Sequence, residues 1–144
     1  MNSITVALAY LGRFARTEFQ IKRYLQRKGF SASEVSDAID YLREHQFLND
    51  DAYAQSYIES RIRKLDGPLK IKQLLIQKGI EAPTAQKLLQ DLYPVEVQIE
   101  NAARLADKKR SRTRDQLKRF VASRGYSPYV IMRSFNAKAQ RRNE

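Results

Sequence analysis

The chain of 144 residues contains no cysteine, four prolines, five glycines and a single histidine. The lack of cysteine excludes disulfide bridges, thiolate metal sites and cysteine nucleophiles. The scarcity of glycine and proline leaves long stretches free to form helices. No segment approaches the roughly 20 apolar residues that span a bilayer, and the N-terminus has no basic leader followed by a cleavage site. We therefore expect a soluble, untargeted protein with no membrane segment.

Residues that could support catalysis are equally scarce. His45 falls at the predicted end of a helix, without the partners of a catalytic site. Asp50 and Asp51 are adjacent carboxylates, and acids at the positive end of a helix dipole explain both. The glycines end helices rather than open them, and no phosphate-binding loop motif occurs. We predict that the protein is not an enzyme and holds no cofactor or metal.

What the sequence does contain is a repeat centred on three glycines. Gly29, Gly79 and Gly125 each follow a basic residue and precede a large apolar one, at intervals of 50 and 46 residues. Such intervals are typical of helical repeats. The segments on both sides of each glycine carry apolar residues at the spacing of one helix face. Glycine ends a helix readily because it adopts the left-handed conformation without a Cβ penalty.

A further helical segment precedes each of these helix pairs, with apolar stripes that include Phe14, Ile58 and Val95. Helix start signals stand at Ser31 or Ser33, Asn49, Pro83 and Ser127-Pro128. The sequence therefore predicts an all-α fold of three tandem three-helix repeats, about nine helices, at residues 1–47, 48–93 and 94–144. Repeats of this kind build elongated and often curved arrays. The last helix is polar at Ser134 and Lys138, so we expect looser packing there.

The positive charge is concentrated in the third repeat. The formal net charge is +11, but residues 1–100 hold 14 basic and 13 acidic residues, whereas residues 101–144 hold 13 basic and 3 acidic ones. A solvated helix face usually mixes the two signs, so this excess indicates a surface for a polyanion or an acidic protein. For Tyr126 and Tyr129, which lie beside it, we expect packing rather than contact. The predicted contact residues are Lys108, Lys109, Arg110, Arg112, Arg114, Lys118, Arg119, Arg124 and Arg133.

Several segments resemble one known family. They are LQRKGF at residues 25–30, LNDDAYAQSYIESR at 48–61, GPLKIKQLLIQKGI at 67–80 and KRFVASRGY at 118–126. The middle stretches are the most specific, and the resemblance extends over nearly the whole chain. In these segments the chain resembles the bacterial regulatory protein family RecX.

That resemblance implies a modular, elongated protein of three tandem three-helix units. We expect the protein to be monomeric and located in the bacterial cytoplasm. It implies binding to the RecA recombinase filament on single-stranded DNA, with mainly inhibitory effects on ATP hydrolysis, strand exchange and filament extension. It also implies binding to single- or double-stranded DNA. An alternative that fits the charge pattern alone is a stand-alone basic helical module that binds DNA.

Overall fold

The structure is a computed structural model that describes the backbone of residues 1–12, 14–109 and 112–142, with side chains up to residue 137. Within these ranges the chain forms nine α-helices and no strand. The helices are α1 (Ser3–Leu11), α2 (Glu18–Arg27), α3 (Ala32–Glu44), α4 (Asp50–Arg63), α5 (Pro68–Gln77), α6 (Ala82–Leu92), α7 (Val95–Asp107), α8 (Arg114–Ser123) and α9 (Pro128–Arg142).

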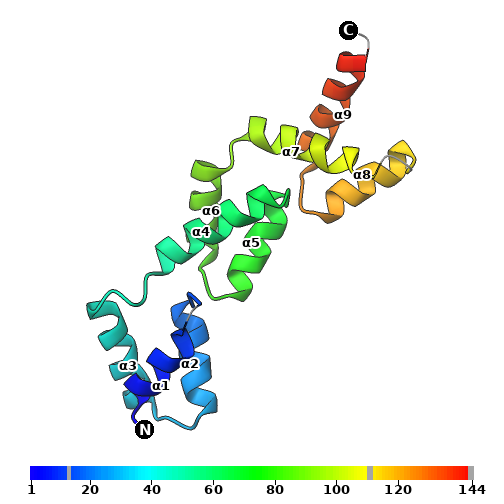
Figure 1. The fold of residues 1–144 in the computed structure, drawn as a ribbon. Helices are drawn as coiled ribbons and strands as arrows, with labels where there is room; N and C mark the ends of the chain where they lie inside the picture. Colours follow the sequence, from blue (N-terminus) through cyan, green and yellow to red (C-terminus); the bar gives the residue numbers. More distant parts are fainter. Residues whose placement is uncertain (13, 110–111, 143–144) are drawn as a thin grey trace.

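The helices pack in consecutive groups of three. In each group, α1–α3, α4–α6 and α7–α9, all three helices contact one another. We call these groups units 1, 2 and 3. They follow one another along an elongated molecule whose two termini lie at opposite ends (Figure 1). The predicted all-α fold of tandem three-helix repeats is therefore confirmed.

The three repeat glycines end helices as predicted. Gly29, Gly79 and Gly125 have φ angles of 90°, 96° and 98°, which lie in the region that favours glycine. Directly after Gly29, the Phe30 amide donates to the Leu25 carbonyl of the preceding helix. The Ile80 amide, directly after Gly79, donates to the Leu75 carbonyl in the same way. This hydrogen bond is typical of a glycine-terminated helix.

The helix starts also agree with the sequence. The Ser31 hydroxyl accepts from the Glu34 amide while the Glu34 carboxylate accepts from the Ser31 amide, which resolves the choice between Ser31 and Ser33. Asn49 accepts from the Ala52 amide at the start of α4. Thr17 forms a reciprocal cap of the same kind on α2, and Thr113 does so on α8. Each cap satisfies amides that a helix start leaves without partners.

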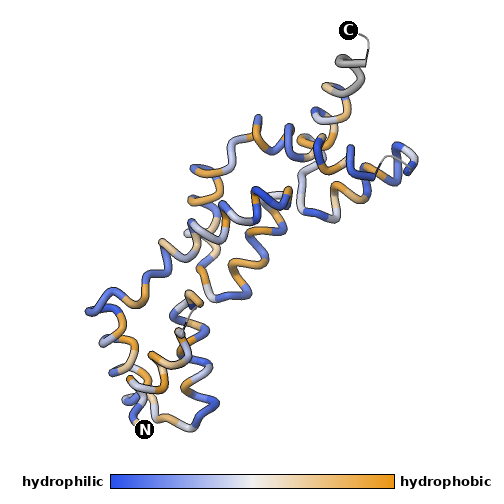
Figure 2. Tube along the Cα trace, viewed as in Figure 1, coloured by the Kyte–Doolittle hydropathy of each residue, from blue (hydrophilic) through white to orange (hydrophobic). Residues whose placement is uncertain are grey.

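The buried apolar residues form two clusters. One lies within unit 1, around Ile21 and Leu42. The other joins units 2 and 3 into a single core. Apolar and polar residues are interleaved along the helices (Figure 2), as one-sided burial requires. Two expected stripe residues lie at the surface instead, because Phe14 is 69% and Val95 is 38% exposed. Ser134 is buried and donates to the Ile131 carbonyl, contrary to the looser packing expected there, while the Lys138 side chain lies outside the described residues.

Neighbouring units meet in the same way at both joints. The glycine turn of each later unit lies on the start of the second helix of the unit before it. At the first joint the Thr17 hydroxyl donates to the Lys78 carbonyl, and a Cβ on Gly79 would lie 2.1 Å from the Phe19 Cβ. At the second joint the Gly67 amide donates to the Arg124 carbonyl over 2.7 Å. The glycines therefore serve twice, as helix ends and as contact points between units.

Candidate nucleic-acid interface

The predicted cationic residues gather on α8 and on the segments that flank it. Lys108 and Lys109 follow the end of α7, Arg112 precedes α8, and Arg114 and Arg119 lie on α8; all five are exposed. Lys118, also on α8, is half-buried. Arg110 lies outside the described residues. Unit 3 therefore presents these side chains from a short stretch of surface rather than scattering them around the molecule.

One group of cations surrounds Phe120. The guanidinium of Arg112 lies 4.8 Å from the centre of the Phe120 ring, and the Lys109 ammonium lies 5.8 Å from it. Arg112, Arg119 and Phe120, with Gln116, line an open hollow of about 570 Å³. Cations over an aromatic face are attracted to its electron density. The ring therefore holds two flexible cationic side chains beside this hollow.

A second group surrounds Phe135 on α9. The Arg114 guanidinium and the Lys118 ammonium each lie 5.7 Å from the centre of that ring. Because they stand four residues apart, Arg114 and Lys118 share one side of α8. Nearer the start of α9, Arg133 donates to the Tyr129 hydroxyl over 2.6 Å, and Tyr129 is 50% exposed rather than packed as expected. Sequence spacing alone did not reveal that aromatic rings organise the cations.

Arg124, another predicted contact residue, forms an ion pair with a buried carboxylate of unit 2. Its Nη2 and Nε lie 2.8 and 3.0 Å from Oδ1 of Asp66, and Nη2 also donates to the Lys64 carbonyl. Its charge is therefore offset by a carboxylate from unit 2. We leave Arg124 out of the proposed contact surface and assign it to the joint.

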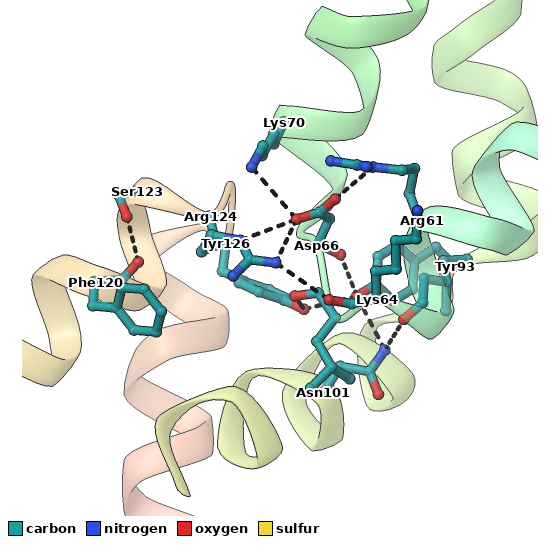
Figure 3. A network of polar contacts seen from close by, with 12 residues as sticks. Arg61, Lys64, Asp66, Lys70, Tyr93, Asn101, Phe120, Ser123, Arg124 and Tyr126 are labelled. Atoms are coloured by element: carbon teal, nitrogen blue, oxygen red, sulfur yellow. Dashed lines mark hydrogen bonds and ion pairs between the residues drawn. The ribbon is translucent and has the colours of Figure 1, made fainter. Parts of the chain in front are cut away.

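Asp66 is the centre of that joint (Figure 3). Its side chain is 1% exposed and is surrounded by three cations from two units. Besides Arg124, the Arg61 Nε lies 2.6 Å from Oδ2, an ion pair without the alignment of a hydrogen bond. The Lys70 ammonium lies 3.6 Å from Oδ1. A buried carboxylate requires such partners because desolvation penalises its charge. Asp66 thereby ties the turn after α8 to the start of α5.

Two buried tyrosines complete the joint. The Tyr126 hydroxyl donates to the Leu65 carbonyl over 2.7 Å, and the Tyr93 hydroxyl donates to the Asp66 carbonyl over 2.8 Å. The two hydroxyls lie 3.0 Å apart, and the Asn101 amide donates to Tyr93. Burial raises the pKa of both phenols above the usual value. The two tyrosine hydrogen bonds hold the backbone at Leu65 and Asp66 in place. Leu65 has a φ of 66°, which is uncommon for a non-glycine residue.

The joint fixes where the cationic surface points, since α8 leads directly into the turn that Asp66 holds. Within the described residues, no cluster of three or more potential metal ligands occurs. No helix in the same part of the chain combines the length and apolar character needed to cross a bilayer. The arrangement is suited to electrostatic contact with an extended anionic partner.

Family models and curated relatives that match this chain belong to one family. Residues 4–42 match the family model described as "RecX, first three-helix domain", and residues 49–89 match "RecX, second three-helix domain". A regulatory protein RecX from Caldanaerobacter subterraneus subsp. tengcongensis is 28% identical over 90% of this chain and 67% of its own length. One from Clostridium perfringens strain 13 is 35% identical over 83% of this chain. The chain spans 60% of the length of that second relative.

Solved structures show the same fold. The crystal structure of RecX from Lactobacillus salivarius superposes with a TM-score of 0.83 at 25% identity, covering 94% of this chain and 93% of the other. A second crystal structure, of a regulatory protein RecX, gives a TM-score of 0.80 at 29% identity over 93% of this chain and 70% of the other. With both domain models matched in order and the fold shared along nearly the whole chain, this protein belongs to the RecX family.

Proposed function

We propose that this protein regulates the RecA recombinase, mainly as an inhibitor, by binding the RecA filament on single-stranded DNA. Bound there, it limits ATP hydrolysis, strand exchange and filament extension. Relatives that match most of the chain carry the name regulatory protein RecX, and this family membership is the observation that carries the proposal. The protein acts as a monomer in the bacterial cytoplasm, and its action is binding rather than catalysis.

The charge of unit 3 supports this function. A nucleoprotein filament presents phosphates and acidic protein surfaces side by side, and both attract cations. Arg112 and Arg119 border the open hollow beside Phe120, where a phosphate would lie between two guanidinium groups. Arginine suits that role because its planar fork donates two parallel hydrogen bonds to a phosphate.

The elongated shape supports it as well. Units that contact only their neighbours can follow a helical filament across several subunits. The three units here follow one another along the length of the molecule (Figure 1). The ties at Asp66 and Thr17 keep the spacing of the units fixed. On this proposal, units 1 and 2 contact RecA while unit 3 supplies most of the electrostatic attraction.

The test is ATP hydrolysis by RecA on single-stranded DNA, measured with and without this protein. We expect hydrolysis to fall at stoichiometric protein. A double substitution, Arg112→Gln with Arg119→Gln, should weaken the inhibition. The control is Arg104→Gln with Lys87→Gln, which removes the same charge from exposed positions away from the hollow. Unchanged hydrolysis and filament length with the unsubstituted protein would refute the proposed function. Equal inhibition by the two double variants would exclude the hollow as a contact.

The alternative is a stand-alone DNA-binding module, which the cationic surface alone also favours. Such a module should bind naked DNA tightly, with an affinity that falls steeply as salt rises, because each phosphate contact on duplex DNA releases about 0.9 counterion. Substitutions in unit 3 alone should abolish its activity. A filament regulator should bind naked DNA more weakly than the filament, and changes in units 1 and 2 should impair it too.

A further inference from the structure

A cleft lies where unit 1 meets α4, far along the chain from the cationic surface of unit 3. Its volume is about 460 Å³, within the roughly 300–1,000 Å³ of typical ligand clefts. It is lined by the segment before α2, the segment before α4, and one face of α4. The lining residues are Ala15, Arg16, Gln46, Phe47, Asn49, Ala52, Tyr53, Ser56 and Tyr57.

Aromatic rings form much of the wall of this cleft. Tyr53 and Tyr57, one turn apart on α4, have nearly parallel rings, with 6.2 Å between centroids and 7° between planes. Phe47 is 54% exposed although it is large and apolar. Such a residue gains free energy when a flat apolar partner covers it. The cleft therefore offers ring surface to a planar ligand.

Arg16 supplies a positive charge at the same place. Its guanidinium lies 4.7 Å from the centre of the Tyr10 ring. Its Nε is buried and has no hydrogen-bond partner among the described residues, which is an unfavourable state for a polar group. No aspartate or glutamate lines the cleft. Charge complementarity therefore selects a ligand that carries a negative group.

Polar side chains around the rings can form hydrogen bonds with the edge of a planar ligand. Asn49 uses its Oδ1 to cap α4, so its amide nitrogen is a donor on a fixed side chain. Gln46 and Ser56 line the cleft with further donors and acceptors. Burial raises the pKa of the Tyr53 and Tyr57 phenols, so both remain neutral donors at neutral pH. Aromatic rings, arginine and side-chain amides together are what proteins use to hold unstacked bases.

We propose that this cleft binds one unstacked base of a single-stranded nucleic acid, with the base against Phe47 and the two tyrosines and its phosphate beside Arg16. An acidic peptide would satisfy Arg16 but would leave three rings and the amide groups without a planar partner, so the base is favoured. The site goes beyond the proposed function, because it lies in units 1 and 2 and its occupancy does not depend on RecA. Together with the surface of unit 3 it gives the protein two separate contacts on one strand.

The experiment uses the full chain and a short single-stranded oligonucleotide that contains 2-aminopurine, whose fluorescence changes when it stacks. We expect binding to quench this fluorescence. Phe47→Ala should weaken binding about tenfold, in line with the contribution of base–aromatic stacking, and Arg16→Gln should weaken it by removing the charge beside the phosphate. Leu69→Ala is the matched control, because Leu69 is also 54% exposed but lies outside the cleft. Circular dichroism verifies that each variant is folded.

Equal affinity and quenching in Phe47→Ala, Leu69→Ala and the unsubstituted protein would overturn the proposal. An aspartate-rich peptide whose binding depends on Phe47 and Arg16, when oligonucleotide binding does not, would make the cleft a peptide site and would also overturn it. The result is separable from the proposed function. The quenching at saturating oligonucleotide should persist in the Arg112→Gln, Arg119→Gln variant, and it is measured without RecA.

Discussion

Gly125 offers the sharpest test of how the units are joined. Alanine at this position would place a Cβ 2.4 Å from the Lys70 backbone nitrogen and 2.6 Å from the Lys70 Cβ. Neither atom can move without shifting the start of α5. Gly29 holds the equivalent position in unit 1 with a similar φ, and a Cβ there would meet nothing within 4 Å. Gly29→Ala is therefore a matched control that carries the backbone cost alone.

The magnitude follows from what each substitution disturbs. Both alanines must adopt a left-handed conformation, which costs about 1–2 kcal/mol. Gly125→Ala must also separate the joint, with loss of the hydrogen bonds from the Gly67 amide to the Arg124 carbonyl and from the Leu69 amide to the Gly125 carbonyl. Each such bond contributes about 1 kcal/mol. We therefore expect Gly125→Ala to lower the free energy of unfolding by about 2 kcal/mol more than Gly29→Ala.

Urea unfolding followed by far-ultraviolet circular dichroism measures this difference. With a urea m-value of about 2 kcal/mol per molar, the transition midpoint of Gly125→Ala should fall about 1 M further than that of Gly29→Ala. Equal losses in the two variants would show that the turn after α8 is not held against the start of α5. The docking of glycine turns between units would then be wrong as a description of the joint.

Two further outcomes test the Asp66 joint. Asp66→Asn should destabilise the protein by about 2–3 kcal/mol. This is below the cost of breaking a fully buried pair, because the three cations are partly exposed. Thermal unfolding measures the loss, and Glu100→Gln, which removes one partner of an exposed ion pair, is the control. Because burial raises the pKa of Tyr93 and Tyr126, their contribution to stability should be full below pH 10 and lost as pH rises toward the raised pKa. A tyrosinate absorbance titration checks this, and normal ionisation of both phenols in the folded protein would contradict it.

The sequence predicted features whose cause is local. Glycine after a basic residue ends a helix through the conformation of one residue, so Gly29 and Gly125 could be assigned from their neighbours alone. The caps at Ser31 and Asn49 depend on amides at most three residues away. The apolar stripes predicted the helices, because burial of one helix face requires apolar residues to recur with the helical period. All-α architecture and family membership were both within reach of these signals.

The features that the sequence did not predict depend on contacts between distant residues. Arg124 and Asp66 are 58 residues apart, and the place of Arg124 before Gly125 indicates a helix end but not a carboxylate partner in unit 2. Phe120 and Phe135 lie on apolar stripes, which gave no sign that cations would gather on their rings. Phe47 stands beside Leu48 in a short connecting segment, and the cleft beside Phe47 exists only where two units meet. Register between units is a tertiary property, so spacing along one helix does not specify it.

The division of the buried apolar residues has a thermodynamic consequence. Units 2 and 3 share one cluster, so neither can unfold without exposing apolar surface of the other. The described residues of unit 1 bury a cluster of their own, and polar contacts such as that from Thr17 to the Lys78 carbonyl link it to unit 2. In a chain of nearest-neighbour couplings, the weaker coupling opens first. Unit 1 should thus open before the rest of the protein, while units 2 and 3 unfold together as a single cooperative block.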